Sequence, residues 1–248
     1  MRLSHFVSIL GATLALSLTH APAMADDAGD KVLTQVDTAL NKAKSHYFEY
    51  EATTQEAGKA EKKVGLNVWI KAEKRLTEFT APADLKGTKV LILSPTEMYV
   101  YLPAFGKVRR IASHTSDQSA FGMAFSQDDL ATQKYSSMYT ATVSSSTDKE
   151  QKVTLTPKAG QTTPYSKIEM TVGKDKNLPT EIKYYNSEGK HIKTETRSGY
   201  SCESDVCTPA TLKMVDHTKN LTTTMSRKKW KVNESINDDT FSKRNLEK

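Results

Sequence analysis

The chain has 248 residues, a formal net charge of +6 and a hydrophobic fraction of 37%. That length allows one large domain or two small ones, and beyond residue 25 no segment is apolar for long enough to cross a bilayer. The basic sequence pI of about 9.1 would suit an anionic partner such as nucleic acid, but the lysines are spread along the chain, which favours an ordinary solvated surface.

The first residues are typical of an export signal. A basic start at Met1-Arg2 precedes an apolar run over 6–18, and the small residues Ala23 and Ala25 follow. The apolar run is short for a membrane span, and no cysteine stands at the cleavage site to carry a lipid anchor. We therefore predict a signal peptide over 1–25, cleaved after Ala25, and an exported mature chain over 26–248. Its predicted location is the periplasm, with release beyond the envelope as an alternative.

The segment from Asp30 to Ala43 is predicted to form a helix, because its apolar residues fall on one stripe and acidic residues cluster at its start. After it, alternating patterns and turn residues predict strands. Short connections between them indicate one meandering, strongly curved antiparallel sheet. Two more short helices are predicted over 126–133 and 238–246. The predicted strands are 46–57, 62–72, 75–80, 87–94, 97–102, 107–112, 138–145, 150–157, 165–173, 179–186, 190–200, 208–217 and 220–232.

Side chains on a strand alternate between two faces, and in three early strands one face carries no charge. That face must be buried against another layer. It either packs in a closed sandwich or wraps as an open sheet over the helix 30–43 and the loop 113–130, with room for an apolar guest. Tyr99 and Tyr101 lie on the opposite face, and what covers them is an open question. The residues of the charge-free face that would contact a guest are Leu66, Val68, Ile70, Val90, Ile92, Met98, Val100 and Leu102.

Motifs for catalysis are absent from the sequence. There is no nucleophile elbow, zinc-protease helix, dinucleotide-binding loop or phosphate loop. The histidines of the mature chain, at positions 46, 114, 191 and 217, have no partner at metal-ligand spacing. Asp128-Asp129 is predicted to be the acidic first turn of a short helix rather than a cation site. The sequence therefore predicts a protein with no catalytic residue, no metal and no cofactor.

Arg109 and Arg110 are adjacent on a predicted strand, so one of them must point toward the apolar side or its rim. A buried guanidinium is costly without a partner. The expected partner is an acid such as Asp128 or Asp129, which would form an ion pair with the loop, and the alternative is an anionic ligand head group. Two cysteines, Cys202 and Cys207, follow the signal segment, and an exported chain is expected to join them in a disulfide.

The segment 79–130 resembles the LolA-like outer-membrane lipoprotein-sorting family. The matching patterns are Pro-x-x-x-Lys-Gly-Thr from Pro82, Tyr-Leu-Pro-Ala-x-Gly-Lys-x-Arg-Arg-Ile from Tyr101, and Phe-Gly-x-x-Phe-Ser-x-x-Asp-Leu from Phe121. Later pieces are similar as well, including the stretch from Pro179 and the closing segment from Asn237. The resemblance covers most of the mature chain, and its central blocks taken together are fairly specific.

The resemblance implies a mainly β fold, an incomplete antiparallel barrel whose mouth is filled by a helix and a short helix or loop lid. It implies a monomeric, non-enzymatic carrier of lipid or acylated lipoprotein that works with an envelope transporter or an outer-membrane acceptor. A lipid-sensing or adaptor module is the alternative. In this scheme the charge-free face is concave, the tyrosine face is covered by loops or docks a partner, and a lid closes over the cargo. The predicted lid residues are Val36, Leu40, Phe121, Met123 and Phe125.

Overall fold

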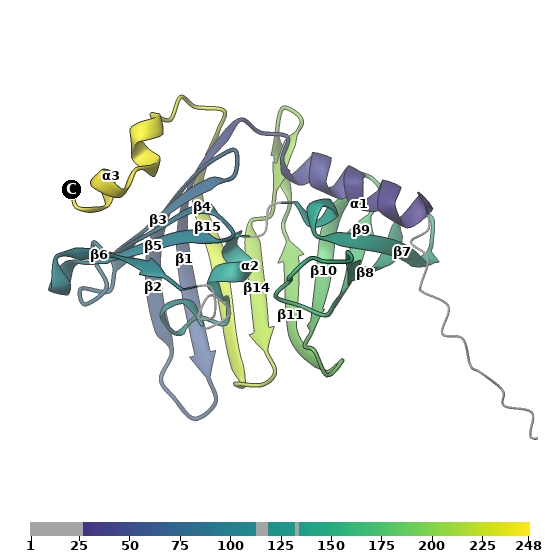
Figure 1. Ribbon diagram of the computed structural model, residues 1–248, viewed down its shortest axis with the longest axis horizontal. Helices are drawn as coiled ribbons and strands as arrows, with labels where there is room; N and C mark the ends of the chain where they lie inside the picture. Colours follow the sequence, from purple (N-terminus) through teal and green to yellow (C-terminus); the bar gives the residue numbers. More distant parts are fainter. Residues whose placement is uncertain (1–26, 113–118, 132–133) are drawn as a thin grey trace, which may run out of the picture.

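The structure is a computed structural model that describes residues 27–112, 119–131 and 134–248, so the predicted signal peptide and His114 lie outside the described residues. A helix comes first and strands dominate the rest (Figure 1). The helix α1 spans Asp27–Leu40. The strands before the loop are β1 (Ser45–Glu56), β2 (Lys62–Lys71), β3 (Lys74–Ala81), β4 (Lys89–Ser94), β5 (Glu97–Leu102) and β6 (Lys107–Ile111).

Short helical turns connect the first strands to the second group. They are η1 (Pro103–Phe105), η3 (Ala120–Gly122), α2 (Gln127–Ala131) and η4 (Tyr135–Ser137). The chain closes with η5 (Asp238–Phe241) and α3 (Lys243–Leu246). The later strands are β7 (Tyr139–Ser146), β8 (Glu150–Pro157), β9 (Lys167–Gly173), β10 (Leu178–Tyr185), β11 (His191–Ser198), β12 (Ser201–Glu203), β13 (Val206–Thr208), β14 (Thr211–Asp216) and β15 (Leu221–Val232).

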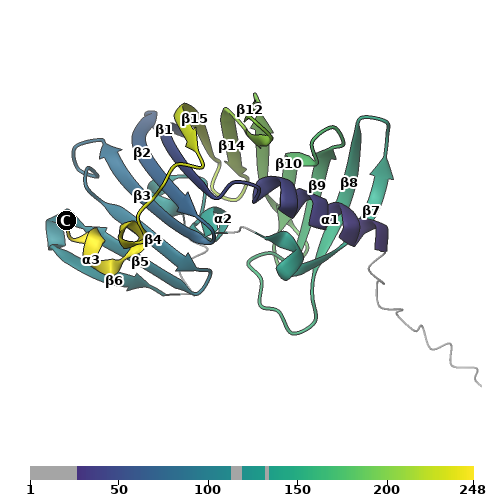
Figure 2. The same cartoon turned by 90° about the horizontal axis from the view of Figure 1, so that it is seen from above.

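One 13-stranded sheet contains every strand except the hairpin β12–β13. Its order is β6-β5-β4-β3-β2-β1-β15-β14-β11-β10-β9-β8-β7, and all neighbours are antiparallel. Two meanders therefore meet where β1 pairs with β15. The sheet bends but does not close, since β6 and β7 stand at opposite edges (Figure 2). This confirms the predicted mainly β, incomplete barrel.

The helix α1 crosses the β7–β10 half on the inner side of the bend, and α2 lies near the junction of the two halves (Figure 2). The apolar stripe of α1 explains how this helix packs on the sheet, because Val32, Leu33 and Val36 are buried in the core. Gly29 makes the approach close: a Cβ there would lie 2.2 Å from the carbonyl oxygen of Ala141 on β7. We call this inner side the concave face.

The opposite, convex face carries a second, smaller apolar core. Leu76 and Leu91 are buried there, with Tyr99 and Tyr101 packed around them. The cover is the C-terminal segment, whose Phe241 and Leu246 are 4% and 0% exposed. This answers the question raised by the two tyrosines, because the chain's own final turns shield that face of β3–β5 from water.

Candidate functional site

The main cavity opens on the concave face, at the junction of the two meanders. It holds about 1170 Å³ of space that no protein atom fills, its open mouth included. Strands β1 to β3 supply one wall, the β11–β15 region supplies the other, and the ends of α1 and α2 border it. The larger apolar side chains of its lining include Leu40, Phe48, Ile70, Phe125, Leu130, Leu212 and Met225.

The predicted guest-contacting residues share the concave face, as the register of the sheet shows. Val68 lies opposite Phe48 on β1 and Thr77 on β3, and Val90 lies opposite Val100 on β5. Most of these side chains are already packed in the protein's own core. Leu66, Val68, Val90, Ile92 and Met98 are buried there, Ile70 and Val100 are partly buried against it, and Leu102 lies outside it.

Of the predicted guest-contacting residues, only Ile70 lines the main cavity. Leu66, Val90 and Ile92 line a smaller cavity, of about 360 Å³, that lies under Phe121 and Met123. The two cavities share Arg75, Leu130 and Met225 in their walls. The hollow over β2–β5 is thus largely filled by the chain itself, and the free space lies beside it.

The predicted lid residues all contact the main core. Val36, Met123 and Phe125 are buried, and Leu40 and Phe121 are partly buried. The ring of Phe121 packs at a tilted angle against that of Phe79 on β3, with ring centroids 4.4 Å apart. Whether these residues move as a lid stays a prediction.

Polar contacts tie the segment 119–131, which we call the mouth segment, to the rest of the chain. The amide of Ala124 donates to the Oγ1 of Thr223 at 2.8 Å, and the Nη1 of Arg75 donates to the carbonyl of Leu130 at 3.1 Å. The carboxylate of Asp129 forms an ion pair with Lys193 at 2.8 Å and accepts the hydroxyl of Tyr165. Thr223, Arg75 and Lys193 belong to three different strands, β15, β3 and β11.

The expected ion pair between Arg109 or Arg110 and the acidic turn is wrong. Asp129 pairs with Lys193, while both arginines are exposed at the edge strand β6. Arg109 lies opposite Val100, so it is the one on the concave face, and its guanidinium sits 5.0 Å from the ring centroid of Phe105. Arg110 donates to the carbonyl of Thr96 at 3.0 Å. Neither has a carboxylate partner in the described part of the chain.

The concave face is also not free of charge, which corrects the expectation of a uniformly apolar hollow. Arg75 lies on it between Ile70 and Ile92. On the far wall Lys193 and Glu195 are buried, and Glu195 accepts bonds from Arg197 and from Tyr184, both at 2.7 Å. The sequence signal that could have found Arg75 is the tight connection between β2 and β3, because pairing Lys71 with Lys74 fixes the face of every later residue of β3.

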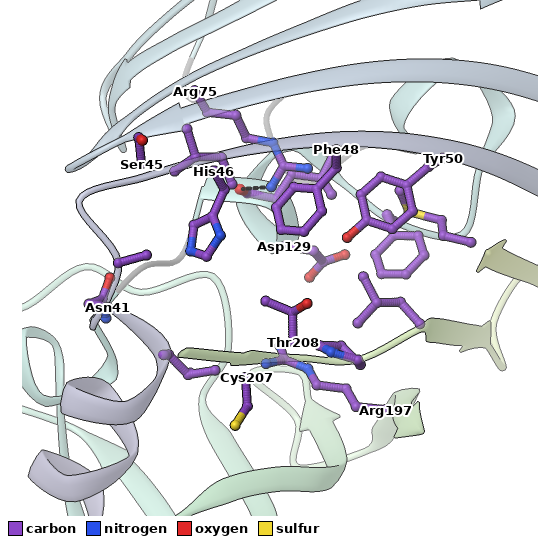
Figure 3. A pocket seen from close by; sticks show the side chains of 18 of the residues that line it. Asn41, Ser45, His46, Phe48, Tyr50, Arg75, Asp129, Arg197, Cys207 and Thr208 are labelled. Carbon is purple, nitrogen blue, oxygen red and sulfur yellow. Dashed lines mark hydrogen bonds between the residues drawn. The ribbon is translucent and has the colours of Figure 1, made fainter. Parts of the chain in front are cut away.

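Polar groups from β1 and β3 gather on one wall of the main cavity (Figure 3). His46, Phe48 and Tyr50 alternate along β1, and Arg75 extends beside them from β3. The indole N–H of Trp230 donates to Nδ1 of His46 at 3.2 Å, so the neutral ring carries its proton on Nε2. Burial lowers the pKa of His46 to about 4, which keeps that ring neutral near pH 7.

The remaining predictions concern cysteines and metals. Cys202 and Cys207 form the expected disulfide across the β12–β13 hairpin, and Cys207 lines the main cavity.

His191 and His217 come together, both with Nε2 at 2.9 Å from the Oγ1 of Thr194. No group of three metal-ligating side chains occurs within 27–112, 119–131 and 134–248. Over those same ranges, no helix combines the length and apolar character needed to cross a bilayer.

Solved structures share this fold over almost their whole length. A DUF1329 family protein from Desulfovibrio piger is 22% identical, with a TM-score of 0.82 over 88% of this chain and 98% of its own. A domain from Vibrio parahaemolyticus, of the outer membrane lipoprotein-sorting type, is 20% identical, with a TM-score of 0.81 over 90% and 99%. A LolA superfamily protein from Nitrosomonas europaea is 18% identical, with a TM-score of 0.73 over 88% and 98%.

Identities of this size show a common fold, and they confirm the LolA-like resemblance at that level. No functionally curated protein matches the chain. One family model, described as "Uncharacterized protein", matches residues 71–248, which is well over half of the chain. The protein therefore belongs to the family of that model and has the half-barrel fold of LolA-superfamily proteins.

Proposed function

We propose that this protein is a non-enzymatic carrier that shelters acyl chains of lipid or lipoprotein between envelope membranes. The observation that supports it best is the main cavity, an open space with a partly apolar lining on the concave face of a LolA-like half-barrel. A solved relative of the outer membrane lipoprotein-sorting type has the same fold. The charged groups around the cavity serve binding and holding in this proposal, with no chemical step.

Such a carrier must balance the free energy of binding its cargo against the need to release it. Burial of each methylene group is worth about 0.8 kcal/mol, so a chain of about sixteen carbons gains roughly 12 kcal/mol on leaving water. The carrier must supply much of that and still release its cargo. A cavity bordered by the mouth segment suits both needs, because separation of that segment, which polar contacts and the buried side chains of Met123 and Phe125 hold in place, would widen the space.

The proposed setting follows from the sequence. A cleaved signal peptide over 1–25 would deliver the mature domain 26–248 to the periplasm, where it would act as a monomer. Its partners would be a lipid or acylated lipoprotein and an envelope transporter or outer-membrane acceptor. Those membranes supply cargo and receive it, and the carrier crosses the aqueous space between them.

The test is binding of a fluorescent sixteen-carbon fatty acid and of a fluorescent lipopeptide to the purified mature chain, together with native mass spectrometry of protein taken gently from the periplasm. Ile70→Trp places a large ring in the wall of the main cavity and should weaken binding at least about tenfold. Ile236→Trp is the matched control, because Ile236 belongs to the convex core. Absence of bound lipid in every preparation, with no uptake of either probe, would overturn the proposal.

A further inference from the structure

One partly buried positive charge in the wall of the main cavity has no negative partner among the described residues. The charged side chains in its wall are Lys44 at the exposed rim, the acids Asp129 and Glu195, and two arginines. Glu195 is taken by Arg197 and Asp129 by Lys193. Arg75 forms no ion pair with any described residue, and desolvation lowers the pKa of its guanidinium.

The bonds that Arg75 does make leave most of its hydrogen-bonding capacity unused. Its Nη1 donates to the carbonyl of Leu130 at 3.1 Å, and its Nε lies 3.5 Å from the Oγ1 of Thr77, at the outer limit for such a bond. A guanidinium carries five N–H donors in a planar fork. A fork with free donors in a partly buried position matches a planar oxyanion, which it can hold through two parallel bonds.

Two further groups add hydrogen-bond donors to the wall of the main cavity that β1 and β3 form. The Tyr50 side chain is 7% exposed, its ring lines the cavity, and its hydroxyl has no partner among the described residues. His46 uses Nδ1 as an acceptor, so it presents an N–H at Nε2. Figure 3 shows Arg75 extending toward the same wall as His46 and Tyr50, with the ring of Phe48 between the last two. No carboxylate of β1 to β3 lines the cavity; Asp129 and Glu195 come from other elements and are paired with Lys193 and Arg197.

Building on the proposed carrier function, we infer that this wall binds the oxyanion head group of the cargo, with Arg75 as the principal contact and Tyr50 and His46 as additional donors. The cargo class is then an acyl amphiphile with one exposed acid group, such as a free fatty acid. The hydrocarbon would run from Arg75 along its cross-strand neighbour Ile70 and across to Leu212 and Met225. A neutral ester of the same chain would leave the guanidinium desolvated and without a partner, which is unfavourable.

The first experiment compares head groups on the native mature chain. Palmitate and methyl palmitate compete for a fluorescent sixteen-carbon probe at neutral pH, and palmitate should bind at least about tenfold more tightly, as expected for a charge-assisted hydrogen bond. An equal affinity for acid and ester would overturn the head-group inference and leave the carrier proposal standing. Failure to bind either would overturn both.

The second experiment changes the wall. Arg75→Met should reduce palmitate affinity about tenfold or more and leave methyl palmitate within twofold, Arg75→Lys should restore part of the loss, and Tyr50→Phe should weaken palmitate severalfold. Arg244→Met is the matched control, since Arg244 is exposed on the C-terminal segment. Unchanged palmitate binding by Arg75→Met contradicts the inference. Should that variant fail to fold, Tyr50→Phe and the acid–ester comparison decide.

The third arm separates an amphiphile from a free anion. Dodecyl phosphate should displace the fluorescent probe, because it offers both an oxyanion and a chain, and inorganic phosphate in large excess should not. Displacement by inorganic phosphate alone would show that the wall takes a small anion, and it would overturn the assignment of a lipid head group.

Discussion

The Nζ of Lys193 lies 2.8 Å from Oδ2 of Asp129, and the two side chains are only 8% and 1% exposed. This pair joins α2 of the mouth segment to β11, which belongs to the far wall of the main cavity. Asp129 also accepts the backbone amide of Ser126 at 2.7 Å and the hydroxyl of Tyr165. The carboxylate is therefore the anchor that holds the mouth segment on the half of the sheet opposite Arg75.

Removal of one partner from this pair should be costly, because the other charge stays buried without compensation. We expect Lys193→Met to lower the free energy of unfolding by about 3 kcal/mol, measured by urea denaturation. Lys228→Met is the control, since its pair with Glu51 is exposed at 54% and 47% and should be worth at most about 1 kcal/mol. Equal losses in the two variants would show that the buried pair has no special role.

Gly29 sets the distance between α1 and the sheet. An added Cβ would meet the carbonyl oxygen of Ala141 at 2.2 Å, which the backbone must move to relieve. We expect Gly29→Ala to destabilise the protein by about 2 kcal/mol in spite of the better helix propensity of alanine, because overpacking at a backbone contact costs more. Gln35→Ala, at an exposed position of the same helix, should change stability by less than about 0.5 kcal/mol. A stable Gly29→Ala variant would mean that α1 is free to shift outward.

Acid should weaken the protein through His46. Its pKa is about 4 in the folded chain and 6.5 when unperturbed, so the unfolded state binds the extra proton between these values. Stability is then fully present above about pH 6.5 and falls as the pH drops toward 4, by about 2–3 kcal/mol. His46→Phe should flatten this slope in urea titrations from pH 7 to 4.

The flattening will be partial, because burial and the neighbouring His217 also lower the pKa of His191. The double variant with His191→Phe should lose more of the slope than either single variant. Between pH 7 and 8 all these proteins should give flat profiles. An unchanged dependence of stability on pH in His46→Phe would contradict the assignment of this dependence to His46.

The C-terminal segment should detach without harm to the main cavity. Phe241→Ala removes a ring that is 4% exposed from the convex core, and we expect the segment to loosen and Trp69, which packs in that core, to shift its emission to the red. Fatty-acid binding should stay within twofold of the native value. Phe105→Ala is the control, since that ring is 58% exposed. A large loss of binding in Phe241→Ala would show that the two faces of the sheet are coupled.

Most of the fold follows from local patterns in the sequence. Alternation and turn residues predicted each strand of the large sheet, because these strands have one buried face and short connections. The hairpin β12–β13 is not predicted, since each of its strands has only three residues, which is too short for an alternating pattern to be recognised. The cover over Tyr99 could not be predicted, because it depends on a contact with Phe241, which is far away in the sequence.

The candidate site was predicted less well, for a physical reason. Grouping charge-free positions finds the side of a sheet that is buried, and Leu66, Val68 and Ile92 are indeed buried. A cavity exists where such packing stops, and it is lined by residues such as Arg75 and Glu195 that this criterion rejects. These charged side chains can stand in the cavity wall because they have partners in other elements, such as Leu130 and Arg197, and no local sequence pattern reveals those partners.

The pairing of β1 with β15 has a consequence for the order of folding. Residues 45–56 meet residues 221–232 at the middle of the sheet, so each meander can build its own neighbouring hairpins early, but their union waits for almost the whole polypeptide. The hollow lies at that union. The ability to bind a ligand should therefore appear only in the final, slowest phase of folding, well after most of the β-structure has formed.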